Sequence, residues 1–118
     1  MSPGTPLREE PPTHADGTRV CGMADALQLV GDKWSLLVVR ELTFGVHRFT
    51  DIQRLTGAPR EALAARLKKL EAVGVLTRTR YSSRPERFEY HLTPEGRELG
   101  ATLRTLRAWG EKYARRSK

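Results

Sequence analysis

Arginine and lysine offer most of the chemistry in this sequence. The chain has 21 of these residues against 14 aspartates and glutamates, a formal net charge of +7 and a pI near 10.2. Because only two of the basic and three of the acidic residues precede residue 21, residues 21–118 carry +8. Arginine binds phosphates and base edges through paired hydrogen bonds, so this excess favours a polyanion-binding surface over a merely solvated basic surface.

One group of these residues follows Gly57, within a segment that runs to about Val73. Leucines at spacings of four and three, Leu63, Leu67 and Leu70, predict a helix with one buried face. The opposite face is predicted to carry small and charged residues: Arg60, Glu61, Ala64, Ala65 and Lys68. A face without large apolar groups lets a helix approach base edges in the major groove of a DNA duplex.

The residues of this helix suggest different contacts. Pro59 suits the first helical position, and Arg60 suits a bidentate contact with guanine O6 and N7. Two roles stay open for Glu61: its carboxylate contacts cytosine, or it stabilises the first helical turn. Arg66, with Lys69, flanks the buried leucines, which favours a phosphate contact or a salt bridge over base reading. The DNA-binding residues expected here are Pro59, Arg60, Glu61, Ala64, Arg66 and Lys68.

A second basic group follows in residues 75–92. Residues 75–81 and 87–92 alternate in the manner of β-strands, and residues 82–86 contain Ser and Pro typical of a turn. The predicted hairpin carries four arginines: Arg78, Arg80, Arg84 and Arg87. Phosphate binding is the preferred role for Arg80 and Arg84, whereas Arg87 has the alternative of pairing with Glu89 on the same strand face.

The preceding segments predict the elements that position these side chains. Helical spacing runs from Cys21 to Gly31, then from an N-cap at Asp32 to Gly45, and then over two turns to Gly57. Two short helices joined by a glycine-containing turn, the second with a polar outer face, are typical of a helix-turn-helix. With the hairpin, the predicted fold is mainly α with a small β-hairpin wing (α+β), a winged helix-turn-helix.

The C-terminal segment predicts a dimer interface. Thr93 and Pro94 mark a helix start, and about 20 helical residues would extend roughly 30 Å, farther than the predicted core can cover. Apolar residues recur along this helix at spacings of three and four, which favours a homodimer. The expected interface residues are Met23, Leu27, Leu99, Leu103, Leu106, Trp109 and Tyr113.

Cys21 is the single cysteine, so no internal disulfide is possible. Two interpretations stay open: a thiol at a helix N-terminus that senses oxidants or electrophiles, and a buried thiol that packs as a small hydrophobe. Trp34, Phe49 and Trp109 are interpreted as core and dimer packing. The three histidines show no metal-ligand spacing, and no catalytic grouping stands out, so no metal, cofactor or enzyme activity is expected.

Several strings resemble the HxlR-type winged helix-turn-helix regulators. The resemblance covers residues 21 to about 113. Its most specific parts are Cys21, Gly31-Asp32-Lys33-Trp34-Ser35-Leu36-Leu37, Arg40-Glu41-Leu42 with Gly45, Arg48-Phe49-Thr50-Asp51-Ile52, Leu63-Ala64-Ala65-Arg66-Leu67-Lys68-Lys69-Leu70-Glu71 and Tyr90-His91-Leu92-Thr93-Pro94-Glu95-Gly96. The resemblance implies a homodimer built from the first and last helices, a recognition helix at about residues 59–72 in the major groove, and a wing on the neighbouring backbone or minor groove.

The expected organisation is a flexible tail at residues 1–20 and one DNA-binding and dimerisation domain at residues 21–118. Without an apolar run long enough for a membrane span or a signal peptide, the chain is expected to be cytoplasmic. The predicted function is a sequence-specific repressor or activator that binds an inverted-repeat operator in double-stranded DNA and responds to a small-molecule or oxidant effector. The alternative is a sequence-blind structural DNA-binding or protein-interaction module of the same fold.

Overall fold

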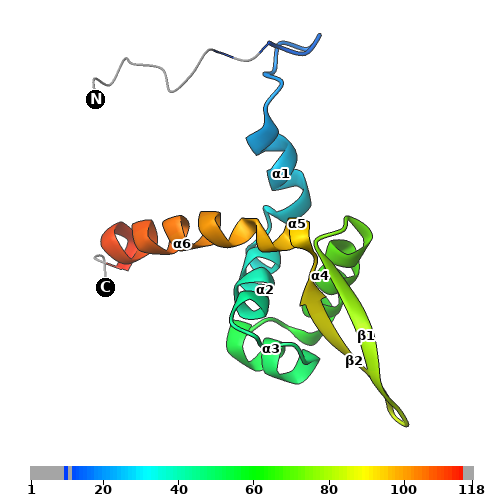
Figure 1. Ribbon diagram of the computed structural model, residues 1–118. Coiled ribbons are helices and arrows are strands. Elements are labelled where there is room, and N and C mark those ends of the chain that lie inside the picture. Colours follow the sequence, from blue (N-terminus) through cyan, green and yellow to red (C-terminus); the bar gives the residue numbers. More distant parts are fainter. Residues whose placement is uncertain (1–9, 11, 116–118) are drawn as a thin grey trace.

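The computed structural model describes residue 10 and residues 12–115. Three central helices pack with a hairpin, and two outer helices leave this centre in different directions (Figure 1). The predicted fold class, mainly helical with a two-stranded antiparallel wing, is confirmed. In chain order the elements are α1 (Gly22–Val30), α2 (Lys33–Thr43), α3 (Phe49–Thr56), α4 (Arg60–Ala72), β1 (Leu76–Ser83), β2 (Glu86–Leu92), α5 (Pro94–Arg97), α6 (Leu99–Trp109) and a π-helical turn, η1 (Gly110–Ala114).

The hydrophobic core lies between α2, α3, α4 and the base of the hairpin. Its side chains come from one face of each helix, as the spacing of the apolar residues predicted. Burial of such side chains stabilises the fold by about 1.5–3 kcal/mol each. The fully or almost fully buried members are Val30, Val38, Val39, Leu42, Ile52, Ala58, Leu63, Leu67, Leu70, Val75, Leu76 and Leu92.

Side-chain caps begin α2 and α5, and a glycine ends α3. Asp32 caps α2, because its carboxylate accepts hydrogen bonds from the Ser35 amide at 2.9 Å and the Ser35 hydroxyl at 2.7 Å. Thr93 caps α5 in the same way, with its hydroxyl accepting from the Gly96 amide at 3.0 Å. Gly57 ends α3 at φ +76°, a left-handed conformation that favours glycine, and so allows the tight turn into α4.

The hairpin is longer at its tip than the sequence indicated. The predicted turn covered residues 82–86, but β1 continues to Ser83 and β2 begins at Glu86, and the Ser82 hydroxyl donates to the Pro85 carbonyl at 2.8 Å. The register shifts between Arg80 and Ser82, which leaves Tyr81 as the extra residue of a β-bulge. Residues before α3 also reach the hairpin, through an antiparallel bridge between Arg48 and Glu89.

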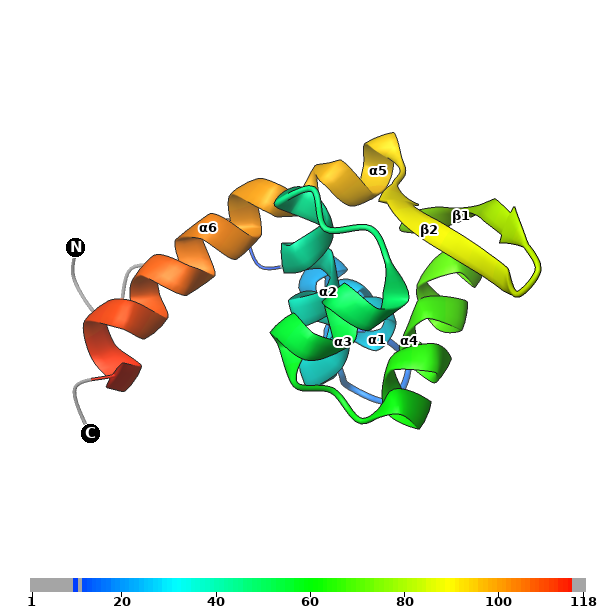
Figure 2. The same ribbon diagram turned by 90° about the horizontal axis from the view of Figure 1, so that it is seen from below.

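The C-terminal helix is interrupted, whereas the sequence predicted one continuous helix. After α5 the amide of Glu98 donates to the Glu95 carbonyl at 3.2 Å, a tightened turn, before α6 begins. From there α6 extends away from the central helices on the side opposite to the hairpin, as Figure 2 shows. Its outer half therefore lies beyond the core of its own chain.

The structure describes only part of the predicted flexible tail at residues 1–20. Residues 1–9 and 11 lie outside the described residues, while Thr13 and Arg19 form an antiparallel bridge around a turn in which Asp16 accepts from the Thr18 amide. The division at residue 20 stays a prediction. In the part of the chain that the structure describes, every helix is too short or too polar to cross a bilayer.

Candidate nucleic-acid interface

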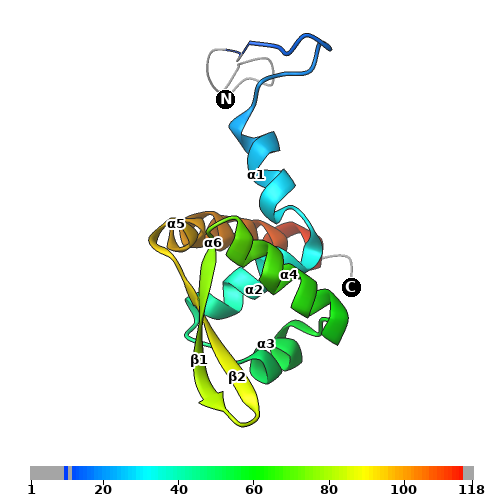
Figure 3. The same ribbon diagram turned by 90° about the vertical axis from the view of Figure 1, so that its right-hand side faces the viewer.

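Helix α4 has the two faces that the leucine spacing predicted. Leu63, Leu67 and Leu70 are at most 2% exposed, whereas Ala64 and Lys68 on the outer face are exposed to solvent. Arg60, Glu61 and Ala65 are exposed on the same helix. In Figure 3, α3, the start of α4 and the tip of the hairpin lie toward the end of the molecule opposite to α1. The helix thus presents a narrow edge of short and basic side chains beside the wing.

The start of α4 differs by one residue from the prediction. Pro59 was expected at the first helical position, but its backbone is not helical (φ −58°, ψ 145°) and it is the N-cap, with its carbonyl accepting from the Leu63 amide at 2.9 Å. The preceding Ala58 is buried in the core, and the Gln53 side chain donates to its carbonyl at 3.4 Å. These contacts hold the turn between α3 and α4 in place.

Arg60 is held at the junction of these two helices. Its guanidinium lies over the ring of Phe49, 5.1 Å from the ring centroid, which is a cation–π arrangement. Within the described residues, neither Arg60 nor Lys68 forms an ion pair with a carboxylate, so both charges remain available to a partner. Glu61 is exposed and unpaired among the same residues, and its two readings stay open.

Arg66 and Lys69 are directed into the protein rather than toward the exposed edge. The Nε atom of Arg66 lies 3.7 Å from Asp32 and is buried without a hydrogen-bond partner among the described residues, while the Lys69 ammonium donates to the Gln28 carbonyl at 3.0 Å. Of the two roles expected for Arg66, this geometry favours the salt bridge. Burial raises the pKa of Asp32, but the Ser35 hydrogen bonds and the Arg66 charge outweigh it and lower that pKa.

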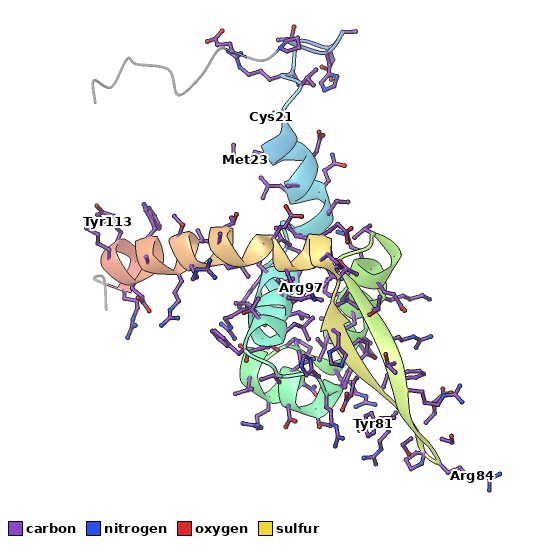
Figure 4. All side chains as sticks on the ribbon, in the orientation of Figure 1. Cys21, Met23, Tyr81, Arg84, Arg97 and Tyr113 are labelled. Carbon is purple, nitrogen blue, oxygen red and sulfur yellow. The ribbon has the colours of Figure 1, made fainter. Side chains whose placement is uncertain are left out.

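The arginines of the wing divide into paired and unpaired groups. Arg78 lies 3.6 Å from Glu71 and over the Phe88 ring, and Arg80 pairs with Glu86 at 2.8 Å. Arg84 lies at the tip of the hairpin (Figure 4) and has no ion pair within the described residues. Exposed ion pairs are weak, so Arg78 and Arg80 could leave their carboxylates to bind a phosphate. Arg84 has no such pair to break, which makes it the wing cation most available to a phosphate.

The suggested pair of Arg87 with Glu89 does not form. Glu89 instead accepts from Arg48 at 3.2 Å and from the His91 ring at 3.4 Å. These two hydrogen bonds lower the pKa of Glu89, and the charge of Arg48 acts in the same direction. Arg48 precedes α3, a segment far from β2 in the sequence, so same-strand spacing was the wrong guide to the partner of Glu89.

Sequence reasoning also missed the cluster around Arg48. The Arg48 guanidinium lies 4.1 Å from the Tyr81 ring centroid, and His47 exchanges two hydrogen bonds of 2.8 Å with the backbone of Tyr90. The rings of His47 and His91 stack with centroids 3.9 Å apart. The Arg48-Phe49 string was noted only for its resemblance, and no spacing rule links it to a strand 41 residues later. Among the described residues, no three His, Cys, Asp or Glu side chains gather to hold a metal ion.

The expected dimer residues fall into two groups. Leu99 and Leu103 are partly buried against the core of their own chain, and their expected role in the dimer stays a prediction. Met23 and Leu27 on α1 are 71% and 55% exposed, and Leu106 and Trp109 on α6 are 52% and 59% exposed. Tyr113 is also exposed and its ring lies 5.4 Å from that of Trp109. A broad apolar surface on α1 and α6 therefore lacks a partner within the described chain.

Cys21 lies at the N-cap of α1, close to Met23 at the start of that helix (Figure 4). Its side chain makes no capping hydrogen bond, and the residue is half-buried. The thiol is therefore neither fully enclosed nor fully open to solvent. This intermediate position leaves both readings of Cys21 in place.

These features define a winged helix-turn-helix of the kind found in transcription regulators, with an exposed second helix and a basic wing. The HxlR-like helix-turn-helix family matches residues 29–118, so the chain belongs to this family. An uncharacterised HTH-type transcriptional regulator of Mycobacterium tuberculosis, Rv3095, is 50% identical over 88 residues. The match includes 75% of this chain and 56% of the relative, so the chain spans little more than half the relative's length.

Solved structures show the same fold. The redox regulator HypR in its oxidised form superposes with a TM-score of 0.72 at 30% identity, covering 78% of this chain and 96% of HypR. The HTH-type transcriptional regulator ytcD superposes with a TM-score of 0.73 at 32% identity, covering 81% of this chain and 99% of ytcD. The names of these relatives are those of transcription regulators rather than enzymes, and this chain shares their helix-turn-helix fold.

Proposed function

We propose that this chain acts as a homodimer in the cytoplasm and binds an inverted-repeat operator in double-stranded DNA. The observation that carries the proposal is the exposed edge of α4, where Arg60, Ala64 and Lys68 lie opposite three buried leucines and beside a basic wing. A helix with such an edge fits the major groove, and two-fold symmetry places the second copy about 34 Å away, one turn of the duplex.

The proposed contacts differ in what they contribute. Arg60 reads guanine, because its guanidinium is unpaired among the described residues and lies at the first turn of α4. Lys68 and Arg84 bind phosphates, which adds affinity through counterion release but carries no sequence information. Ala64 contributes by its small size, since a larger side chain would keep the helix away from the bases.

Operators selected from random duplex DNA by the full-length protein provide the test. We expect an inverted repeat, and we expect Arg60→Ala to lower operator affinity by roughly 1–3 kcal/mol and to relax the preference at one base pair of each half-site. Lys68→Ala should weaken binding to all sequences alike and reduce the salt dependence. The matched control is Arg19→Ala, which also removes one exposed arginine. Arg19 belongs to the segment before α1, which Figure 1 shows at the end of the molecule opposite to the wing.

The alternative function is a sequence-blind binding module. Competition of the selected operator against bulk DNA at one salt concentration separates the two, because a protein that contacts only the backbone shows little preference. Equal competition by both DNAs, or unchanged affinity in both Arg60→Ala and Lys68→Ala, would contradict the proposal.

We also propose that DNA binding responds to an effector through Cys21 or the surface beside it. The half-buried thiol lies at the N-cap of α1, a helix with an exposed apolar face, so a modification there would act on the α1 side of the proposed dimer interface. The structural neighbour HypR is described as a redox regulator, which supports this proposal. An oxidant titration of operator affinity should shift the wild-type protein but not Cys21→Ser. Equal insensitivity of both proteins would exclude oxidant sensing at Cys21.

A further inference from the structure

Arg48 connects the helix-turn-helix to both strands of the wing. Its carbonyl accepts from the Ile52 amide at 2.9 Å and so begins α3, while its backbone bridges Glu89 in β2. Its side chain donates to the Glu89 carboxylate at 3.2 Å and lies over the Tyr81 ring at 4.1 Å. Helix α3 and both strands of the hairpin therefore meet at a single residue.

Tyr81 is placed to make this contact by the irregularity in β1. As the extra residue of the bulge, it has no partner in the register between Arg80 and Ser82. A bulge bends a strand and increases its local twist, so its geometry decides where the following residues point. The ring of Tyr81 covers the guanidinium of Arg48, which fixes the bulge relative to α3.

The residues beyond the bulge are held by contacts within the hairpin: the strand pairs, the Ser82–Pro85 hydrogen bond and the Arg80–Glu86 ion pair. Ser83, Arg84, Pro85, Glu86 and Arg87 are all exposed. A two-stranded hairpin is marginally stable by itself, so its direction depends on contacts at its base. At about 3.3 Å per residue, Arg84 lies about 10 Å past Tyr81, and a small tilt at the bulge would move it out of hydrogen-bonding range of a phosphate.

We propose that the stack of Arg48 on Tyr81, braced by Glu89, is a positioning contact that sets the angle of the wing and thereby holds Arg84 on the DNA backbone. This inference rests on the proposed function. Arg48 is then a positioning residue rather than a phosphate ligand. The bulge residue matters for its ring and not for its hydroxyl, because the contact is with the aromatic face.

The test is a double-mutant cycle between Tyr81 and Arg84, measured as operator affinity across a salt series with the full-length protein. Tyr81→Ala changes no charge, yet we expect it to weaken binding by roughly threefold to tenfold and to lower the salt slope by about 0.9 for each wing phosphate lost. Tyr81→Phe should bind like the wild type. In an Arg84→Ala background, Tyr81→Ala should have no further effect, because the contact that it positions is already absent.

The other outcomes show whether the wing inference or the proposed function is wrong. Wild-type affinity in Tyr81→Ala, or losses that simply add in the double variant, would overturn the positioning role. Weak binding by Arg48→Ala combined with wild-type binding by Tyr81→Ala would make Arg48 a direct phosphate ligand and likewise overturn it. If Arg60→Ala weakens binding but Arg84→Ala does not, only the inference about the wing is wrong. If neither Arg60→Ala nor Lys68→Ala weakens binding, the proposed function itself is contradicted. Thermal melting of each variant by circular dichroism controls for folding.

Discussion

Asp32 shows how one side chain serves two elements at the residue scale. It caps α2 through Ser35 and receives Arg66 from α4 at 3.7 Å. The sequence predicted the cap, because an aspartate before an apolar helical run is the preferred N-cap. It did not predict that the same carboxylate would draw Arg66 away from the exposed edge of α4.

Replacing Asp32 by alanine should destabilise the fold by about 1 kcal/mol, because the Ser35 amide at the start of α2 loses its acceptor. Asp32→Asn keeps a capping oxygen and should lose less. Chemical denaturation at neutral pH measures both differences. Arg66→Ala is the control for the ion pair, and a loss for Asp32→Asn equal to that for Asp32→Ala would show that the charge matters more than the cap.

The lowered pKa of Asp32 also predicts a pH dependence. Because this pKa is lower in the folded than in the unfolded chain, the carboxylate stabilises the fold fully above the unfolded value, and this contribution disappears as the pH falls through the folded value. The stability difference between the wild type and Asp32→Asn should therefore be present at neutral pH and vanish in strong acid. A difference that grows toward acidic pH would contradict this sign. Denaturation curves across the acid range provide the measurement.

At the scale of elements, the packing of α5 on the hairpin depends on Gly96. A Cβ atom at this position would lie 2.1 Å from the Val75 carbonyl oxygen, which is backbone and cannot swing aside. The same carbonyl accepts the Thr93 amide at 3.0 Å, so the cap of α5 and the start of β1 share one contact region. The close approach lets the chain leave the wing and enter the C-terminal helices.

Gly96→Ala should destabilise the fold by about 1–3 kcal/mol, because the helix and the strand must separate to admit the methyl group. Gly110→Ala is the matched control, since Gly110 has helical backbone angles and open space around its Cβ position. The control should be neutral or slightly stabilising. Urea denaturation compares the two, and equal stabilities would show that α5 does not pack this tightly against β1.

At the scale of the whole molecule, the outer half of α6 has no core to cover it. The radius of gyration is 17.3 Å, whereas a compact chain of 118 residues would have about 13.5 Å. Leu106 and Trp109 are exposed on the extended part, and Met23 and Leu27 are exposed on α1. A second copy packed on these faces is the simplest way to remove this surface from water.

Trp109→Ala should therefore raise the dimer dissociation constant by on the order of tenfold or more, as expected for a central aromatic interface residue. Sedimentation equilibrium over a range of protein concentrations gives the constant. Phe44→Ala is a control, because Phe44 is 61% exposed but ends α2 rather than lying on α1 or α6. A wild-type protein that stays monomeric at all concentrations would refute the homodimer and, with it, the inverted-repeat operator.

Local patterns in the sequence determined most of the elements of this protein. The leucine spacing of α4, the caps at Asp32 and Thr93, and the turn at Gly57 each depend on residues within one or two helical turns, so propensity and periodicity suffice to predict them. The edge of α4 with Arg60 and Lys68 follows from the same spacing, because the buried leucines define the opposite face.

The partners of the charged residues were decided only by tertiary structure. Arg66 pairs with Asp32, and Glu89 pairs with Arg48. Leu99 and Leu103 pack against the core of their own chain. Each of these contacts joins elements whose separation in space depends on how the helices and the hairpin pack, and no periodicity within one element encodes that separation. The folded chain alone therefore decides which cations remain for DNA and which apolar residues remain for a second subunit.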